Sequence, residues 1–164
     1  DPDHPEVRAQ LGYAGDGGMV LSGPEDARGV PAGRKIAVFA QTTLSPGFYR
    51  EVVAALERRG LDLIVTDSLC PYVGRRQRWI AEVSGVADLS LILGGRNSSN
   101  TRKLHELAAA NGPAVHLSSP EELDVGETLR YPLVALTAGA STSDRTIREV
   151  VSRLEAAGAL IEYR

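Results

Sequence analysis

Four segments of the chain concentrate hydroxyl, amide and glycine residues, which can surround an anion with hydrogen-bond donors. They are residues 41–45 (QTTLS), 67–71 (DSLCP), 94–100 (GGRNSSN) and 138–143 (AGASTS). Each follows a short apolar run and precedes a stretch with helical features, so each joins a strand to the amino terminus of a helix. Helix amino termini carry unpaired N–H groups and a partial positive charge that favour anions, phosphate above all. Together the segments predict a site for an anionic ligand.

Any one of these segments has a simpler explanation. Ser, Thr and Asn are the favoured helix caps, so a single loop of this kind is more often a cap than a ligand site. Four such loops occur in this one small chain, however, and Asn97-Ser98-Ser99-Asn100 exceeds what one cap requires. We therefore favour an anion site and keep the capping interpretation as the alternative.

Cys70 and a short amino-terminal motif are the other candidates for chemistry. Cys70 is either a small buried hydrophobe or, because it precedes a helix amino terminus, a thiolate that binds metal or attacks. The sequence leaves these two interpretations equal. His4 and Glu6 are one residue apart beside Pro5, where an extended chain would point both side chains the same way as a proton-handling pair. His105 and His116 lack Cys, Asp or Glu at ligand spacing, so we expect them to be structural or exposed.

The strands and helices that would position these residues are those of an α/β protein. Five short apolar runs predict strands, and helical segments alternate with them, which implies a parallel sheet with ligands at its carboxyl edge. The predicted strands are residues 36–40, 61–65, 89–93, 114–117 and 133–136, and the predicted helices are 46–58, 74–83, 100–110, a short one after 119, and 143–157. We expect the first strand to be covered on both faces, and residues 1–34 to be irregular with a short strand at 19–21.

Composition narrows the class of partner. The chain has 164 residues, enough for one domain or two small ones, and its net charge of -3 argues against a nucleic-acid partner. No apolar run is long enough to span a membrane and no signal peptide opens the chain, so no membrane partner is expected. One cysteine excludes an internal disulfide and indicates a cytoplasmic protein. Because the chain starts at Asp1 without a Met, we expect truncation, processing or a missing preceding segment.

The motifs together resemble the LytB family, the 4-hydroxy-3-methylbut-2-enyl diphosphate reductases. The matching segments, in the family's order, are His4-Pro5-Glu6-Val7, residues 41–45, Cys70 with Arg76-Gln77, residues 95–100 and residues 137–141. The resemblance runs from His4 to the last helix and covers the later part of a three-lobed trefoil. It implies small parallel sheets flanked by helices, with a middle lobe at residues 1–66 and a carboxyl-terminal lobe at 67–164.

The resemblance also implies roles for named residues. Cys70 would be one of three cysteines that hold an iron–sulfur cluster of the [4Fe–4S] kind, and Glu6 would relay protons. Thr42, with Gln41 alongside, would sit near the hydroxymethyl end of an allylic diphosphate substrate. The residues that would hold its diphosphate are Ser98, Ser99, Asn100 and Ser141, with His4 beside them. The implied reaction is reductive dehydration to isopentenyl and dimethylallyl diphosphate in isoprenoid biosynthesis, with electrons from a separate donor.

The chain departs from the family pattern in ways that keep other hypotheses open. Pro71, Tyr72 and Val73 follow Cys70 where the family usually has an Ala and a Thr, and one thiolate alone cannot retain the cluster. Our leading hypothesis is therefore a reductase active only with an amino-terminal lobe from the same gene or a separate subunit. The alternatives are a non-redox diphosphate-binding module and a structural α/β scaffold whose loops are only helix caps.

Overall fold

The computed structural model describes residues 2–163 and divides into two compact units. The first unit ends at Gly74 and the second begins at Arg75, a few residues after the lobe boundary expected between 66 and 67. Each unit has its own parallel sheet with helices beside it, so the predicted α/β class with small parallel sheets is confirmed.

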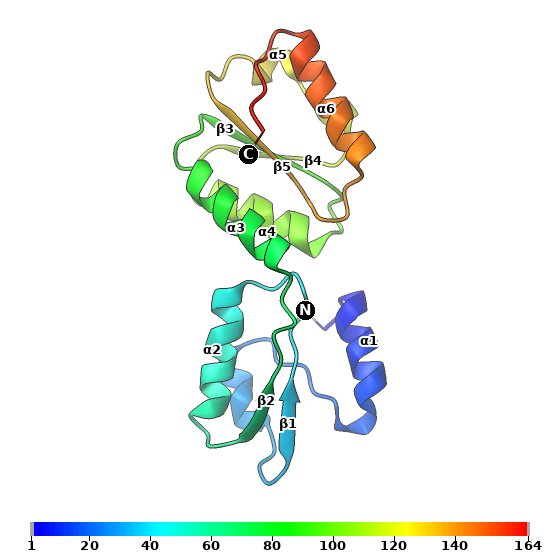
Figure 1. Ribbon diagram of the computed structural model, residues 1–164, viewed down its shortest axis with the longest axis vertical. Coiled ribbons are helices and arrows are strands. Elements are labelled where there is room, and N and C mark those ends of the chain that lie inside the picture. Colours follow the sequence, from blue (N-terminus) through cyan, green and yellow to red (C-terminus); the bar gives the residue numbers. More distant parts are fainter. Residues whose placement is uncertain (1, 164) are drawn as a thin grey trace. The chain divides into compact units, whose positions relative to one another are not determined.

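The first unit is built on two parallel strands, β1 (Lys35–Val38) and β2 (Asp62–Val65), paired in register from Lys35↔Asp62 to Val38↔Val65. Helix α2 (Pro46–Glu57) connects them, and Figure 1 shows it lying along the strands. Its apolar face packs with the 3₁₀ helix η2 (Pro24–Gly29) in one core that includes Val52 and Leu56. The expectation that the first strand is covered on both faces is wrong, because Val38 is the one buried residue of β1 and Phe39 is 57% exposed.

The amino-terminal segment is more regular than predicted. It forms helix α1 (Pro5–Ala14), followed by the 3₁₀ helix η1 (Gly15–Gly17), and residues 19–21 are not a strand. Helix α1 has Pro5 at its first position and Glu6 in its first turn, and it ends at Gly15, whose φ of 60° suits glycine. No residue of α1 is buried, so the apolar periodicity that identifies most helices is missing.

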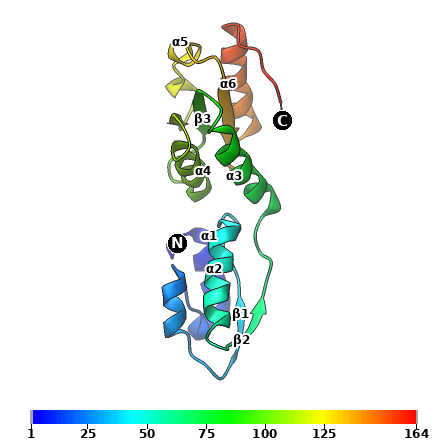
Figure 2. The ribbon, with the colours of Figure 1, turned by 90° about the vertical axis from the view of Figure 1, so that its left-hand side faces the viewer.

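The second unit is a three-stranded parallel sheet in the order β4-β3-β5. Its central strand β3 (Leu89–Leu93) is buried at every position and pairs with β4 (Ala114–Leu117) and β5 (Val134–Ala138). Helix α6 (Asp144–Ala156) packs against Leu89, Leu91 and Leu93, whereas Ile92 contacts α3 (Pro71–Val83) and α4 (Ser99–Ala109). The helices therefore cover both faces of this sheet (Figures 1 and 2). The short helices η3 (Pro120–Glu122) and α5 (Val125–Thr128) lie between β4 and β5 in the chain.

In each unit, candidate residues lie in the loops at the carboxyl edge of the sheet. In each unit the loops that follow the strands lead into helix amino termini, at Ser45 for α2, Ser98 for α4 and Ser143 for α6. Each of these serines accepts a hydrogen bond from a backbone N–H in the first turn, which is the capping role expected for its type. Among residues 2–163, no helix is both long and apolar enough to cross a membrane.

Candidate functional site

In the first unit, Thr42 brings three of the predicted site residues together. The Thr42 N–H lies 3.1 and 3.2 Å from the two Glu6 carboxylate oxygens, and its Oγ1 donates to Glu6 Oε2 at 3.0 Å. On its other side, the Thr42 carbonyl accepts a hydrogen bond of 2.9 Å from the N–H of Cys70. The carboxylate, the hydroxyl and the cysteine backbone therefore form one connected group at the carboxyl ends of β1 and β2.

His4 and Glu6 belong to the start of a helix. The expectation of an extended pair is wrong, because His4 is the N-cap of α1 and Glu6 is in its first turn. The Nδ1 atom of His4 accepts a hydrogen bond of 3.2 Å from the Glu6 N–H. A ring nitrogen that accepts carries no proton, so neutral His4 bears its proton on Nε2. The helix start still brings the two side chains to the same end of the unit.

Several hydrogen bonds fix the strand ends that carry this group. The Tyr49 hydroxyl lies 3.1 Å from the Val38 carbonyl oxygen and 2.8 Å from that of Thr66, so it ties β1 to the residue after β2. Burial raises the pKa of Tyr49 above its usual value, and the negative charge of Asp67 raises it further. The Ser68 hydroxyl accepts from the Ala40 N–H at 2.7 Å. These contacts hold the loops of Thr42 and Cys70 next to each other.

Gln41 and Cys70 differ in exposure. Gln41 is buried, and its side-chain amide donates to the Thr43 hydroxyl. Cys70 is a free, partly exposed cysteine directly before α3, and its carbonyl accepts from the Gly74 N–H at 3.1 Å. Helix α3 thus begins at Pro71, three residues before the predicted start, since proline at the first helical position suits a helix start.

Cys70 is the one candidate ligand for a metal centre that the described residues provide. Within residues 2–163, no group of three or more His, Cys, Asp or Glu side chains is placed to hold a metal ion. A partly exposed cysteine at a helix start suits one ligand of an iron–sulfur cluster. The remaining ligands of any such cluster would have to come from outside the described residues.

In the second unit, the β3–α4 loop contains buried polar groups that lack partners. Ser98 caps α4 by accepting from the Thr101 N–H at 3.3 Å. The next turn buries Asn100, 4% exposed, and Thr101, 0% exposed. The Asn100 amide oxygen, the Asn100 amide nitrogen and the Thr101 hydroxyl have no hydrogen-bond partner in the described part of the chain. A buried polar group without a partner costs free energy, so these three atoms indicate a ligand that pairs with them.

The β5–α6 loop lies beside the β3–α4 loop. The Gly139 N–H donates to the Leu93 carbonyl at 2.8 Å, and the Thr142 hydroxyl donates to the same carbonyl at 3.1 Å. A Cβ atom on Gly94, whose φ is 144°, would lie 2.8 Å from the Thr101 hydroxyl oxygen, and one on Gly139 would come closer still. The loops therefore approach at distances that only glycine allows.

The structure divides the predicted site residues between the two units. The first unit contains His4, Glu6, Gln41, Thr42 and Cys70, and the second contains Ser98, Ser99, Asn100 and Ser141. Within the second unit, the first three belong to the β3–α4 loop and the start of α4. The exposed Ser141 lies on the neighbouring β5–α6 loop.

Sequence reasoning missed three residues that support these loops. Tyr49 and Thr101 were not singled out. Arg76 was treated only as part of a basic run and of the family motif, yet its guanidinium donates to the Ala138 carbonyl at 2.9 Å, at the end of β5. The bonds of Tyr49 and Arg76 join residues that are 11 or more positions apart in the chain, so no local pattern could have found them.

Comparisons with known proteins agree on one family. The family model described as "LytB protein" matches residues 1–155 of the chain. A relative from Nitratidesulfovibrio vulgaris is called 4-hydroxy-3-methylbut-2-enyl diphosphate reductase. It is 36% identical over 159 residues, which cover 94% of this chain and 57% of the relative. A relative of the same name from Pelobacter propionicus is 37% identical over 155 residues, with coverages of 94% and 55%.

A solved structure shares the fold. It is the E-1-hydroxy-2-methyl-but-2-enyl-4-diphosphate reductase from Plasmodium falciparum, with a TM-score of 0.79 and 26% sequence identity. The match covers 94% of this chain and 50% of that protein. The chain therefore spans about half the length of the relatives that it matches.

Proposed function

Because the chain belongs to the LytB family, we propose that it is part of a 4-hydroxy-3-methylbut-2-enyl diphosphate reductase. The proposed reaction is the reductive dehydration of this allylic diphosphate to isopentenyl and dimethylallyl diphosphate. The observation that carries the proposal is the buried, unpartnered amide of Asn100 in the loop that the family motif occupies. The names of the relatives support the reaction class, and their greater length supports the proposal that other parts of the enzyme would complete it.

The second unit would bind the diphosphate. The Asn100 amide and the Thr101 hydroxyl supply three unpaired polar atoms, and Ser98, Ser99 and Ser141 add hydroxyls from the two adjacent loops. The amino terminus of α4 adds backbone N–H groups and a partial positive charge. The serine and asparagine side chains of the two loops are neutral, so they would bind the anion through hydrogen bonds alone.

The first unit would handle the proton and one cluster ligand. The Thr42 hydroxyl donates a hydrogen bond to the Glu6 carboxylate, with 3.0 Å between Oγ1 and Oε2. A proton that reaches Glu6 can therefore be passed on through the Thr42 hydroxyl. Gln41 and Thr42 would orient the allylic part of the substrate, and His4 would contribute to binding its diphosphate. The backbone bond between Cys70 and Thr42 holds the two residues side by side.

Cys70 would hold an iron–sulfur cluster, which we propose to be of the [4Fe–4S] kind, together with ligands from outside these residues. When bound, such a cluster supplies the electrons that remove the hydroxyl group of the substrate. A separate electron donor would reduce it. A cytoplasmic location fits this role, since a reducing compartment keeps a free cysteine such as Cys70 reduced.

A second candidate function is a diphosphate-binding module without redox chemistry. The described residues contain one cysteine and no three-ligand metal group, and Pro71, Tyr72 and Val73 follow that cysteine. Such a module would keep the diphosphate site of the second unit and would not need Cys70. Cluster formation by the whole gene product separates the two candidates.

Titration calorimetry of the chain with inorganic diphosphate tests diphosphate binding, which both candidate functions require. We expect saturable binding that weakens roughly tenfold or more in Ser98→Ala, because one hydrogen bond to a charged group is lost. Ser45→Ala is the matched control, since Ser45 caps α2 with the same 3.3 Å bond but lies outside the proposed site. Both variants should lose about 1 kcal/mol of stability as caps. Absence of binding by the folded chain, or equal affinity of the two variants, would refute the proposed site.

A further inference from the structure

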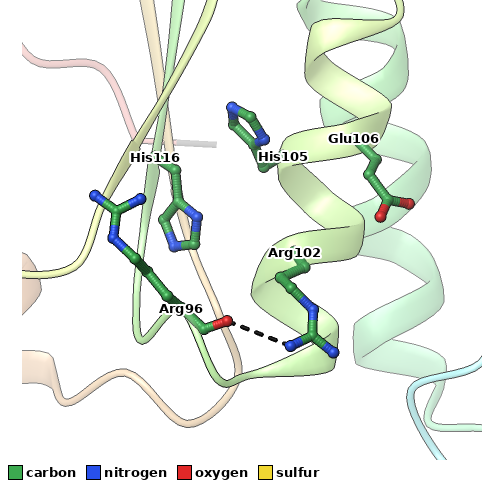
Figure 3. Close-up of a pocket in the computed structure, with 5 residues that line it drawn as sticks. All are labelled: Arg96, Arg102, His105, Glu106 and His116. Atoms are coloured by element: carbon green, nitrogen blue, oxygen red, sulfur yellow. Dashed lines mark hydrogen bonds between the residues drawn. The ribbon is translucent and has the colours of Figure 1, made fainter. Parts of the chain in front are cut away.

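Side chains from neighbouring elements fix the backbone of the β3–α4 loop. The Nε2 atom of His116, on β4, is 2.8 Å from the Gly94 carbonyl oxygen. The guanidinium of Arg102, on α4, donates to the Arg96 carbonyl at 3.4 Å, the dashed line in Figure 3. The β5–α6 loop has a bond of the same kind, in which a side chain from a different element holds the carbonyl at which the loop begins.

The side chain that holds the β5–α6 loop is Arg76 of α3. Its guanidinium donates to the Ala138 carbonyl at 2.9 Å, and Ala138 is the last residue of β5 and is 6% exposed. In the strand order β4-β3-β5, β5 is an edge strand. The outer edge of such a strand presents carbonyls that no neighbouring strand pairs. Arg76 therefore supplies the partner that this buried carbonyl lacks within the sheet.

The peptide group between Ala138 and Gly139 is held from both sides. Its N–H, that of Gly139, donates to the Leu93 carbonyl of β3 at 2.8 Å. In a planar trans peptide the N–H and the C=O point in opposite directions, so the Ala138 carbonyl points away from β3. Arg76 binds that carbonyl on the outer side. The two bonds together fix the plane of the peptide group at which the loop leaves β5.

This peptide group begins the turn that carries Ser141. The Thr142 N–H donates to the Gly139 carbonyl at 3.0 Å, which closes a four-residue turn with Ser141 at its third position. A Cβ atom on Gly139 would overlap the Thr101 hydroxyl oxygen, so Gly139 lies directly against the first turn of α4. Because the turn starts at this fixed point, the orientation of its first peptide group determines where Ser141 lies beside α4.

We propose that Arg76 is a positioning residue for the diphosphate site, which sets the orientation of the Ala138–Gly139 peptide group and through it the place of Ser141. A guanidinium suits this task because it is planar and permanently charged, so its bond to a carbonyl is strong and directional. The proposal rests on the proposed function, in which Ser141 binds the diphosphate. It gives Arg76 no contact with the anion, so the loss of Arg76 should lower the affinity only while Ser141 is present.

A double-mutant cycle with inorganic diphosphate tests this role by titration calorimetry. Arg76→Met removes the guanidinium, and Ser141→Ala removes the hydroxyl that it positions. We expect each single variant to bind diphosphate roughly three- to tenfold more weakly than the wild type. The double variant should bind like Ser141→Ala alone, because Arg76 then has no hydroxyl to position. If the two fold-changes multiply instead, Arg76 acts on the anion independently of Ser141, and the proposal is overturned.

Amide hydrogen exchange of the chain without ligand gives a second readout. Arg76→Met should speed exchange of the Gly139 N–H several-fold, because its peptide group loses one of the two bonds that fix it. The Ile92 N–H, in the buried strand β3, is the reference. A general loss of stability would speed exchange at both positions by the same factor, and that result would overturn the positioning role.

Arg78→Met is the matched control, since Arg78 is an exposed arginine on the same helix. It should leave the diphosphate affinity unchanged, whereas equal weakening by Arg78→Met and Arg76→Met would indicate a general charge effect and overturn the proposal. A folded wild-type chain that binds no diphosphate would refute the diphosphate site and this role with it. Wild-type binding that Arg76→Met leaves unchanged would refute the role of Arg76 alone, and the proposed function would stand.

Discussion

Replacing Asn100 by leucine separates a ligand-binding amide from a structural one. Asn100 is 4% exposed, and both polar atoms of its side chain lack partners among residues 2–163. A structural amide at this depth would donate and accept within the chain, and removing it would destabilise the fold. A ligand-binding amide instead lowers the free energy of unfolding of the protein without ligand, because its polar atoms are then unpaired. Asn100→Leu should therefore abolish diphosphate binding without loss of stability.

The magnitude follows from the two unpaired atoms. Each buried polar group without a partner costs roughly 1–3 kcal/mol, and leucine removes both costs. Leucine is larger than asparagine, and overpacking in a filled site costs about 1–3 kcal/mol. The opposing effects leave a free energy of unfolding between about 1 kcal/mol below and about 5 kcal/mol above that of the wild type.

The assay is urea denaturation with and without inorganic diphosphate. A ligand at one hundred times its dissociation constant stabilises the folded state by about 2.7 kcal/mol, so the wild-type chain should gain that amount and Asn100→Leu nothing. Asn97→Leu is the control, because Asn97 is on the same loop but exposed. It should keep the diphosphate effect. The reasoning is refuted if Asn100→Leu loses more than about 2 kcal/mol without ligand and still gains stability from diphosphate.

Two further results are expected in the first unit. Tyr49→Phe should cost about 1 kcal/mol at neutral pH, because the hydroxyl bond between the strand ends is lost. The pKa of Tyr49 is raised by burial and by Asp67, so its contribution is complete below about pH 10 and is lost as pH rises through the folded-state pKa. Denaturation from pH 8 to 11 should therefore show a shallower alkaline decline in Tyr49→Phe; equal slopes would contradict this. Glu6→Gln should speed hydrogen exchange of the Thr42 amide several-fold, since the charged acceptor is lost. Glu51→Gln, on the exposed side of α2, is its control, and unchanged Thr42 exchange would contradict the role of Glu6.

The regular part of the fold was predictable because its periodicity is local. From residue 35 onward, apolar runs and helix caps located the five strands and the main helices. Helix α1 was missed because none of its residues is buried. Its remaining signals were Pro5, Glu6 and Gly15, which together mark a helix start and end.

The site was predictable only as a set of loops. The contact of Glu6 with Thr42 joins residues 36 positions apart, and that of Arg76 with Ala138 joins residues 62 apart. The pairing of His105 with His116 depends on strand register, since His116 lies opposite Ile92 while α4 packs on the same side. Local spacing contains no information on such contacts.

We propose that this chain supplies one cluster ligand and the diphosphate site of a reductase. The most direct test is anaerobic reconstitution of the full-length gene product with iron and sulfide, followed by turnover of 4-hydroxy-3-methylbut-2-enyl diphosphate with a chemical reductant. We expect cluster absorption and substrate consumption in the wild type, and loss of both in Cys70→Ser. A wild-type protein without a cluster, or a Cys70→Ser protein with the same cluster and turnover, would contradict the assignment.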